Sequence, residues 1–293
     1  MPKKKSTKAT VAHTSVSSVS ISPYQEIWVG DVRNAASLLP PSSVQAIVTS
    51  PPYWGLRSYG AEKEIGAEST LPEYLDEMSG VFASLRHALR NDGTMWLVLG
   101  DTYTSGNRTY RHSDKKHLHR AMVKRPKTPD GLKPKDLIGL AWRVAFRLQE
   151  DGWYLRSETI WNKLNPLPES VKDRPHLAHE HVFLFSKCQK YSFDWGALRA
   201  FDSTRFRPSR SVWSTSVNTG IKGHAAPFPI ELIKPCVAAS TAPGDVILDP
   251  FAGSGSVGIA CEALGRRFLG IELIQENVDL ALERSRQRVN GSL

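Results

Sequence analysis

The segment from residue 246 to residue 272 constrains the fold more than any other part of the chain. Residues 246–248 are apolar, Asp249 follows them, and the glycine-rich turn Pro-Phe-Ala-Gly-Ser-Gly leads into a helical pattern at residues 257–264, which Gly265 ends. Residues 267–271 predict a second strand. A strand, a glycine-rich turn and a helix together form the first half of a nucleotide-binding α/β unit.

The residue types in this segment favour a ligand that carries a ribose. Glycines let the backbone approach a ligand closely. Glu272 stands at the end of the second strand, where a carboxylate can accept hydrogen bonds from ribose hydroxyls. The turn lacks the lysine of a phosphate-binding loop, which argues against a nucleoside triphosphate. A glycine-rich turn is a weak signal alone, and the acidic residue strengthens it.

Strand and helix patterns alternate along most of the chain. Seven strands are predicted, at residues 26–30, 44–49, 94–99, 154–161, 181–186, 246–248 and 267–271. Helices are predicted at residues 71–90, 134–150, 230–239, 257–264 and 274–289, and Asn91-Asp92-Gly93 predicts a turn. This alternation indicates an α/β fold with a mainly parallel sheet and helices on both faces. Ligands bind such a sheet at the carboxyl ends of its strands, where Asp31, Ser50, Asp249 and Glu272 all fall.

A rigid corner follows the second predicted strand. Two consecutive prolines, Pro51 and Pro52, fix the backbone and remove two amide donors, so the corner's carbonyls can only accept hydrogen bonds. Ser50 adds a hydroxyl, and Tyr53 and Trp54 add aromatic faces. Acceptors beside a stacking ring suit a planar base that carries an amino group. Taken alone, the corner is equally well explained as a stiff turn before a loop.

Together the two segments resemble the amino-methyltransferases that modify exocyclic nitrogens of DNA bases with S-adenosylmethionine. The base corner precedes the cofactor turn, as in the circularly permuted β group, and the spelling Ser-Pro-Pro-Tyr resembles its cytosine-N4 members. The resemblance implies a Rossmann-like, seven-stranded methyltransferase sheet with an inserted DNA-recognition region. Trp161-Asn162-Lys163, the turn at residues 165–168 and His179-Glu180-His181 look like further family landmarks.

The resemblance also implies roles for individual residues. The catalytic corner that holds an extruded base would be Ser50, Pro51, Pro52 and Tyr53. The residues that bind the cofactor would be Asp31, Asp249, Phe251, Gly253, Ser254, Gly255, Glu272 and His224. Ser256 departs from the threonine of many relatives but keeps the hydroxyl.

Positive charge is concentrated in two stretches. The 293-residue chain carries a net charge of +9, yet residues 103–135 alone hold ten lysines or arginines against two aspartates, and four lysines lie in residues 1–23. We expect the first stretch to be an insertion that contacts DNA phosphates and the second to be a disordered tail before the catalytic domain at residues 24–293. A solvated loop without a partner is the alternative. The expected phosphate contacts are Arg108, Arg111, Lys115, Lys116, Arg120, Lys124, Arg125 and Lys127, with residues 194–222 as a candidate target-recognition segment.

Composition favours an intracellular, cytoplasmic enzyme without a membrane segment. No run of residues has the length and apolar character of a membrane span, and the basic N-terminus is not followed by the apolar core of a secretory signal. Three widely spaced cysteines suit a reducing compartment. We expect no metal site, because His176, His179 and His181 have only Glu180 nearby, on the other side of a strand. Cys236 is expected to be a core thiol rather than a nucleophile.

The sequence leaves three alternatives to cytosine-N4 methylation of double-stranded DNA. The same corner can hold adenine for N6 transfer, the chain can be a DNA-binding regulator with a degenerate pocket, or the substrate can be structured RNA. A restriction-modification, phage or prophage context is expected, with a cognate endonuclease that acts on the same site without direct contact. The target sequence and the oligomeric state are not encoded in any motif that we recognise.

Overall fold

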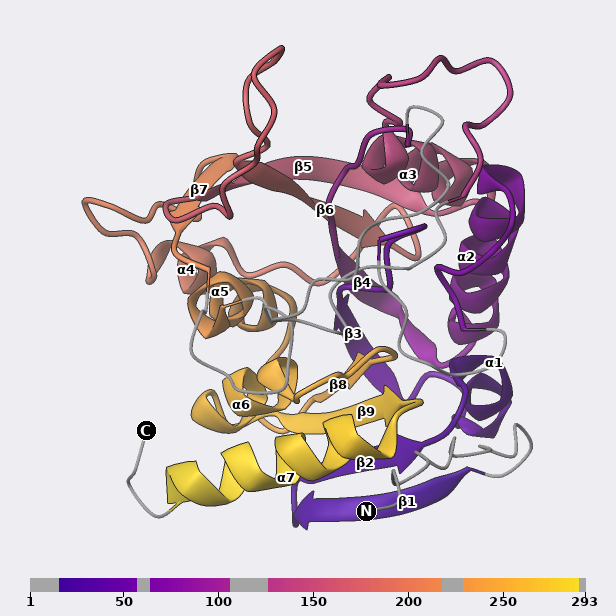
Figure 1. The fold of residues 1–293 in the computed structure, drawn as a ribbon. Coiled ribbons are helices and arrows are strands. Elements are labelled where there is room, and N and C mark those ends of the chain that lie inside the picture. The colour runs from indigo at the N-terminus through magenta and orange to yellow at the C-terminus, as the bar shows by residue number, and fades with distance from the viewer. Residues whose placement is uncertain (1–15, 57–63, 106–125, 218–228, 290–293) are drawn as a thin grey trace, which may run out of the picture.

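The computed structural model describes residues 16–56, 64–105, 126–217 and 229–289 of the chain. Within these residues one sheet has the strand order β1-β2-β9-β8-β3-β4-β6-β5-β7 (Figure 1). Its strands are β1 (Ser17–Ser22), β2 (Gln25–Val29), β3 (Val44–Thr49), β4 (Leu89–Leu99), β5 (Tyr154–Lys163), β6 (His179–Ser186), β7 (Val212–Thr215), β8 (Val246–Asp249) and β9 (Arg267–Glu272).

The sheet is mainly parallel, which confirms the predicted fold class. Strands β2, β9, β8, β3 and β4 run parallel to one another, and β7 is parallel to β5. Strand β6 is antiparallel to both β4 and β5, so β5 again points in the direction of β4. The carboxyl ends of β2, β9, β8, β3, β4 and β5 therefore meet at one edge of the sheet, together with the amino end of β6.

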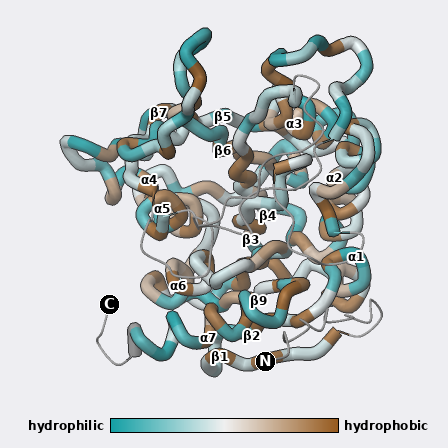
Figure 2. Tube along the Cα trace, in the orientation of Figure 1, coloured by the Kyte–Doolittle hydropathy of each residue, from teal (hydrophilic) through white to brown (hydrophobic). Residues whose placement is uncertain are grey.

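Helices cover both faces of the sheet in three layers (Figure 1). One hydrophobic cluster joins a face of the sheet to α1 (Val32–Ala35), the short 3-10 helix η1 (Ala36–Leu38), α2 (Leu71–Leu85) and α3 (Leu140–Glu150). A second cluster joins the other face to α4 (Trp195–Arg199), α5 (Ile230–Ser240), α6 (Ser256–Ala263) and α7 (Gln275–Val289). Figure 2 shows the apolar residues gathered in the central strands and in the helix faces that meet them.

Local sequence explains how the elements begin. Helix α2 starts with a capping box, in which the Thr70 hydroxyl accepts from the Glu73 amide while the Glu73 carboxylate accepts from the Thr70 amide. Strand β3 is buried at every position, as expected for a central parallel strand covered on both sides.

The order of the central strands brings distant parts of the chain together. Strand β8 lies between β9 and β3, and it pairs with β3 through Ala46 with Ile247 and Ile47 with Leu248. Segments about two hundred residues apart thus become neighbours, and the turns that follow β3 and β8 open on the same edge.

The structure corrects several predicted boundaries. Ser17–Ser22 forms strand β1 on the sheet edge, so the expectation of disorder up to Pro23 was wrong for these residues. Their serine-rich alternation is a weak strand signal. The strand is stabilised by its pairing with β2 rather than by its local propensity. Strand β7 (Val212–Thr215) was also missed, which raises the described strands from the predicted seven to nine.

The predicted turn at Asn91-Asp92-Gly93 lies inside β4 instead. Helix α2 ends at Leu85 rather than Arg90, and β4 begins at Leu89. The pairing of β3 with β4 shifts between Val44 and Ala46, because Val44 pairs with Leu89 and Ala46 with Thr94. The predicted turn residues therefore form an irregular part of β4, where its pairing with β3 is interrupted. Helix α3 begins at Leu140, six residues after the predicted start.

Candidate active site

Four predicted site residues lie at the ends of four adjacent strands. Asp31 follows β2, Glu272 ends β9, Asp249 ends β8 and Ser50 follows β3. The amide of Gly30 donates to the Glu272 carbonyl at 2.9 Å, which ties the first two ends together. The carboxylates of Asp31, Glu272 and Asp249 are all buried. The predicted positions are therefore assembled along one edge, whereas their roles remain predictions.

A buried hydrogen bond links the base corner to the glycine-rich turn. The hydroxyl of Thr49, the last residue of β3, donates to Asp249 Oδ1 at 2.6 Å, and the Phe251 amide donates to the same oxygen at 3.1 Å. Thr49 and Asp249 are 0% and 1% exposed, respectively. Burial raises the pKa of Asp249 to about 7, against the smaller opposing effect of its hydrogen bonds. The two motifs thus share one buried carboxyl group.

The base corner is held on both sides by hydrogen bonds. Pro51 is buried, and the Pro52 carbonyl accepts from the Tyr74 hydroxyl at 3.0 Å. The Tyr53 hydroxyl lies 3.2 Å from Ser50 Oγ and donates to Glu180 Oε2 at 3.0 Å. Glu180 also forms an ion pair with Lys163 of β5, whose ammonium group lies over the Trp161 ring. Ser50, Tyr53, Glu180 and Lys163 therefore form a connected polar network.

Gly100, the residue after β4, makes room for the Tyr53 ring. A Cβ atom at this position would lie 2.8 Å from Tyr53 Cε2, which is closer than nonbonded carbons approach. The sequence motifs around Lys163 and Glu180 were noted only as family landmarks. The contact of Glu180 with Tyr53, and of Lys163 with Glu180, depends on the pairing of β5 with β6 beside β4, which the sequence did not predict.

The predicted cofactor turn is organised around Glu272. The Gly253 amide donates to Glu272 Oε2 at 2.7 Å, and the Ile274 amide and the Asn277 side chain donate to Oε1 at 2.9 and 3.1 Å. Burial raises the pKa of Glu272, while these donors oppose the rise. Gly255 adopts φ +75°, and a Cβ there would lie 3.0 Å from Cβ of Ala281 in α7. Phe251 is half-buried beside the turn.

A buried arginine on α7 supports the same turn and was missed in the sequence. Arg284 Nη1 donates to the Ser254 carbonyl, to Ser254 Oγ at 2.7 Å and to Ser256 Oγ at 3.3 Å. Ser254 is 2% exposed, so its hydroxyl faces Arg284 rather than the open edge. If Ser254 contacts the cofactor, as predicted, it would do so through its backbone rather than through its hydroxyl. The mixed charges of α7 gave no signal that one arginine would point inward.

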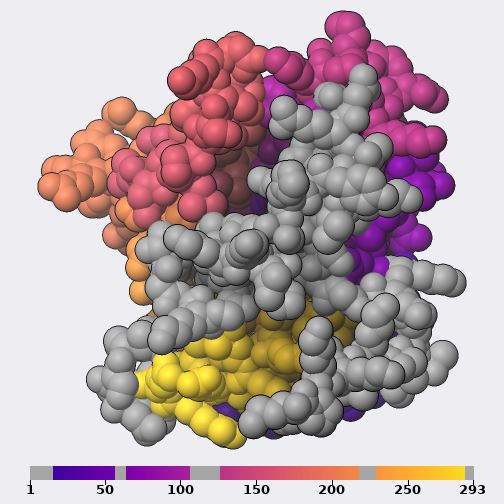
Figure 3. Space-filling view, in the orientation of Figure 1, coloured from indigo at the N-terminus to yellow at the C-terminus, as the bar shows by residue number. Residues whose placement is uncertain are grey.

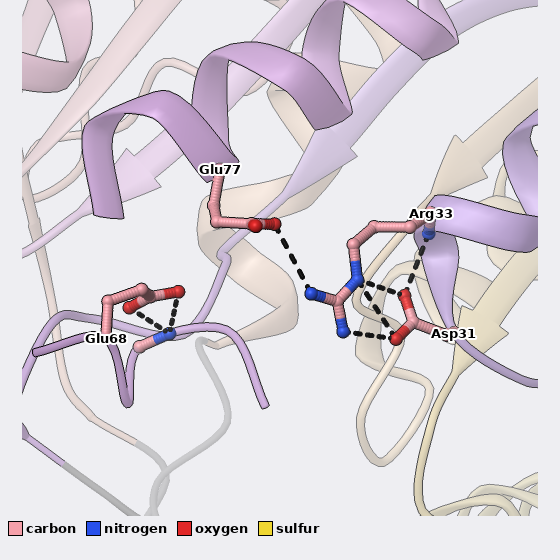
Figure 4. Close-up of polar contacts among 5 residues, drawn as sticks. Asp31, Arg33, Glu68 and Glu77 are labelled. Atoms are coloured by element: carbon pink, nitrogen blue, oxygen red, sulfur yellow. Dashed lines mark hydrogen bonds and ion pairs between the residues drawn. The ribbon is translucent and has the colours of Figure 1, made fainter. Parts of the chain in front are cut away.

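Asp31 is clasped by a neighbouring arginine (Figure 4). It caps α1 by accepting from the Arg33 amide at 2.9 Å, and it accepts from Arg33 Nε at 2.9 Å and Nη2 at 2.5 Å. Arg33 Nη1 also reaches Glu77 Oε2 of α2 at 3.3 Å. Nearby, the Glu68 carboxylate accepts from the Gly66 amide, and burial raises the pKa of Glu68. Arg33 thereby fixes the carboxylate that the resemblance places near the cofactor.

Most predicted DNA contacts lie outside the described residues. This holds for Arg108, Arg111, Lys115, Lys116, Arg120, Lys124 and Arg125, and for His224 of the predicted cofactor site. Lys127 is described and exposed. Its neighbour Pro126 is packed so close to Gly55 that a Cβ on Gly55 would lie 2.6 Å from Pro126 Cγ. The described end of the basic stretch is therefore beside the base corner.

The predicted histidine cluster makes contacts within the sheet through His181. The described residues contain no group of three or more histidine, cysteine or acidic side chains that could hold a metal ion. His181 Nδ1 lies 2.6 Å from Glu158 Oε1, and its ring stacks on Phe183. Cys236 is a buried core thiol, as expected, and burial raises its pKa. In the part of the chain that the structure describes, no helix is both long and apolar enough to cross a membrane.

Comparison with known proteins identifies the class of protein to which this fold and its two motifs belong. Residues 44–283 match the family model described as DNA methylase, with N6 and N4 amino-methyltransferases in its name. The chain therefore belongs to this DNA methylase family.

Named relatives agree over nearly the full chain. It is 53% identical over 259 residues to the type II methyltransferase M.Cfr9I of Citrobacter freundii, which covers 88% of this chain and 86% of the relative. It is 48% identical over 266 residues to M.SmaI of Serratia marcescens, covering 90% and 91% of the two chains.

Solved structures agree with the fold. The PvuII DNA methyltransferase (cytosine-N4-specific) superimposes with a TM-score of 0.68 at 21% identity, covering 91% of this chain and 92% of that one. A DNA modification methylase from Thermus thermophilus, complexed with S-adenosyl-L-methionine, gives a TM-score of 0.63 at 28% identity and covers 90% and 93% of the two chains.

Asp249 makes the stability of the protein depend on pH. Because its pKa of about 7 in the folded state lies above its value near 4 in the unfolded chain, the folded state holds the proton more tightly. This contribution is complete below about pH 4 and is lost as the pH rises to about 7. Asp249→Asn should remove this decline in the free energy of unfolding, which is on the order of a few kcal/mol between about pH 4 and pH 7. Urea unfolding of both proteins at pH 5 and 7.5 measures it; parallel pH profiles would contradict the assignment.

Proposed function

We propose that the protein is a site-specific DNA methyltransferase that transfers a methyl group from S-adenosylmethionine to the exocyclic N4 of cytosine in duplex DNA. The observation that carries this proposal is the Thr49–Asp249 hydrogen bond, because it joins a base-binding corner to a cofactor turn at one sheet edge. The corner is spelled Ser-Pro-Pro-Tyr, and a structural neighbour is named cytosine-N4-specific.

The residues of the turn fit S-adenosylmethionine. The cofactor supplies a methyl carbon bound to a positively charged sulfur. Glu272 offers a buried carboxylate to ribose hydroxyls, and Asp31 offers another near the adenine. Gly253 and Gly255 bring the backbone close to the ligand, while Phe251 adds an apolar side chain. Acidic groups on this side suit a ligand that carries positive charge.

The corner is suited to activate an amino nitrogen. The lone pair of the cytosine N4 is delocalised into the ring, so the nitrogen is a poor nucleophile. Acceptors on both amino hydrogens, the Ser50 hydroxyl and the Pro51 carbonyl, would favour a pyramidal nitrogen with a free lone pair. When bound, the cofactor would supply the methyl group to that lone pair, while Ser50 and Pro51 hold the amino hydrogens, and the amino proton that is lost would pass to solvent. The acceptors stabilise the positive charge that develops on nitrogen.

Tyr53 orients the base by stacking on it. Its hydroxyl is fixed between Ser50 and Glu180, and Lys163 neutralises the Glu180 carboxylate. A ring held at its hydroxyl would keep the base in one plane, so that nitrogen, methyl carbon and sulfur are aligned, and such positioning is worth several kcal/mol. The base must leave the duplex to reach this corner.

DNA is held by the basic insertion at residues 103–135, in this proposal. Lys127 is the described member of the expected phosphate contacts, and its neighbour Pro126 packs against Gly55 of the corner loop, which supports a role for Lys127 near the base. Residues 194–222 form the candidate target-recognition segment. The type II relatives support a restriction-modification context, in which an endonuclease with the same target would act separately on the DNA.

The product identifies the reaction. Plasmid DNA methylated by the purified protein and digested to nucleosides should contain N4-methylcytosine, separated and identified by mass spectrometry. N6-methyladenine in its place would refute the cytosine assignment while keeping the methyltransferase. The absence of any methylated base together with no binding of S-adenosylmethionine would refute both.

Substitutions of Tyr53 separate stacking from hydrogen bonding. Tyr53→Ala removes the ring and should lower kcat by about a hundredfold, because stacking is worth about 1–3 kcal/mol per base. Tyr53→Phe keeps the ring and loses the contacts to Ser50 and Glu180, so its loss should be smaller, about tenfold. The affinity for S-adenosylmethionine, measured by calorimetry, should not change in either variant. Equal losses in the two variants would contradict stacking.

Substitutions of Arg284 test the support of the cofactor turn. Arg284→Met leaves the buried Ser254 carbonyl without this donor, so the dissociation constant for S-adenosylmethionine should rise about tenfold or more. Arg284→Lys should restore part of the affinity, because one ammonium donor can still reach the turn. Isothermal titration at a temperature where both variants are folded measures the effect. An unchanged dissociation constant in Arg284→Met would show that α7 does not organise the site.

A further inference from the structure

Two strongly exposed leucines stand near the base corner. Leu164 is 60% exposed and Leu167 is 55% exposed, in the loop that follows β5. This loop, residues 164–178, projects beyond the sheet edge near the top of Figure 1, and Figure 3 shows it at the molecular surface. A single exposed apolar side chain is common in proteins. A pair three residues apart in one projecting loop is less common and forms a small apolar surface.

The loop is fixed rather than loosely attached. The Leu164 amide donates to the Thr215 carbonyl at 3.1 Å, and the Lys163 amide donates to the Ala178 carbonyl at 2.8 Å across the base of the loop. The Asn165 side chain accepts from the Val217 amide at 2.6 Å and donates to the Val217 carbonyl at 3.2 Å. Pro166 and Pro168 restrict the backbone between and after the leucines. The two apolar side chains are therefore presented to solvent at defined positions.

The loop has a direct connection to the base corner. Leu164 follows Lys163, whose ammonium group pairs with Glu180, and Glu180 accepts from the Tyr53 hydroxyl. Both leucines lie at the carboxyl edge of the sheet because β5 runs parallel to β3 and β4. Strands β4 and β6 separate β3 from β5, and three strand spacings amount to about 14 Å. This distance is close to the width of a DNA groove, about 12 Å.

Exposed apolar side chains can stabilise DNA from which a base has been extruded. A base that leaves the duplex breaks its stacking contacts and leaves a gap between its neighbours. Proteins that distort DNA fill comparable gaps with apolar side chains such as leucine. A solvent-exposed leucine gains by entering that gap, since it removes its own apolar surface from water.

We propose that Leu164 and Leu167 form an apolar wedge that enters the duplex beside the target base and stabilises its extruded state. The proposal rests on the methyltransferase function above and adds a duplex-penetrating element to it. The leucines contact neither the cofactor nor the reacting atoms; they act on the equilibrium between the stacked and the extruded base. The occupant of this surface is a DNA duplex.

The wedge predicts a loss that depends on base pairing. After the methylated position has been mapped on plasmid DNA, two oligonucleotide duplexes are made, one fully paired and one with a mismatch at the target base. Leu164→Ala combined with Leu167→Ala should lower kcat/KM on the paired duplex by about tenfold or more. The loss on the mismatched duplex should be less than about threefold, because a mismatched base is extruded at a lower cost. The fluorescence of a cytosine analogue that pairs with guanine, placed at the target, should fall in parallel on the paired duplex.

A matched control is available within the chain. Leu38 is 58% exposed in η1, which leads into the amino end of β3 and so lies at the opposite edge of the sheet. Leu38→Ala should leave both substrates unaffected. Thermal unfolding of all variants confirms that they are folded, and sedimentation velocity compares their oligomeric states.

Three results would overturn the wedge. They are an equal loss on the two duplexes, no loss on the paired duplex, and a change of oligomeric state that identifies the leucines as a protein interface. Failure of the proposed function gives a different result, since the wild-type protein would then produce a base other than N4-methylcytosine, or none, on both duplexes.

Discussion

The hydrogen bond between Thr49 and Asp249 is the contact on which the site depends. It joins residues two hundred positions apart in the sequence, and it is buried at the ends of two paired strands. Each motif alone would be an ordinary loop at a sheet edge. Their adjacency follows from β8 entering the sheet beside β3, which leaves the two turns about one strand spacing apart, close to 5 Å. In the proposed function, a cofactor in one turn would therefore lie close to a base in the other.

Charge divides the site into two sides. Buried carboxylates from β2, β8 and β9 occupy the cofactor side, where backbone amides and Arg33 hold them. The base side contains the neutral Ser50 and Tyr53 and the compensated pair of Lys163 and Glu180. Lys127 is exposed, and its neighbour Pro126 packs against Gly55, just after the corner. In the proposed function, this arrangement would place acidic groups around the methyl donor and a cation near the DNA.

The sequence predicted the parts of the fold that have strong local signals. Residues 246–272 showed strand, turn and helix directly, and the four strand-end residues were placed correctly because parallel strands share a carboxyl edge. Strand β1 was missed because serines carry little strand propensity, and β7 because its four residues stand among serines and arginines, without the apolar run that marked β8. The turn signal at residues 91–93 was misleading, since pairing with β3 outweighed local preference.

Contacts of the site that arise from tertiary packing could not be predicted in the same way. Glu180 and Lys163 belong to β6 and β5, and only the observed strand order places them beside Tyr53. Arg284 is one of several arginines in α7, and its inward direction follows from the packing of that helix on the glycine-rich turn. Sequence motifs predicted the groups to which the proposed function assigns the chemistry, while the groups that support them became visible only in three dimensions.

The position of β8 has a consequence for how the polypeptide is made. This strand lies in the middle of the sheet, yet it emerges from the ribosome after all the strands of the described chain except β9. Until then, β2 and β3 lack the strands β9 and β8 that pair with their facing edges. Insertion of this central strand is therefore a late non-local step of the kind that slows folding.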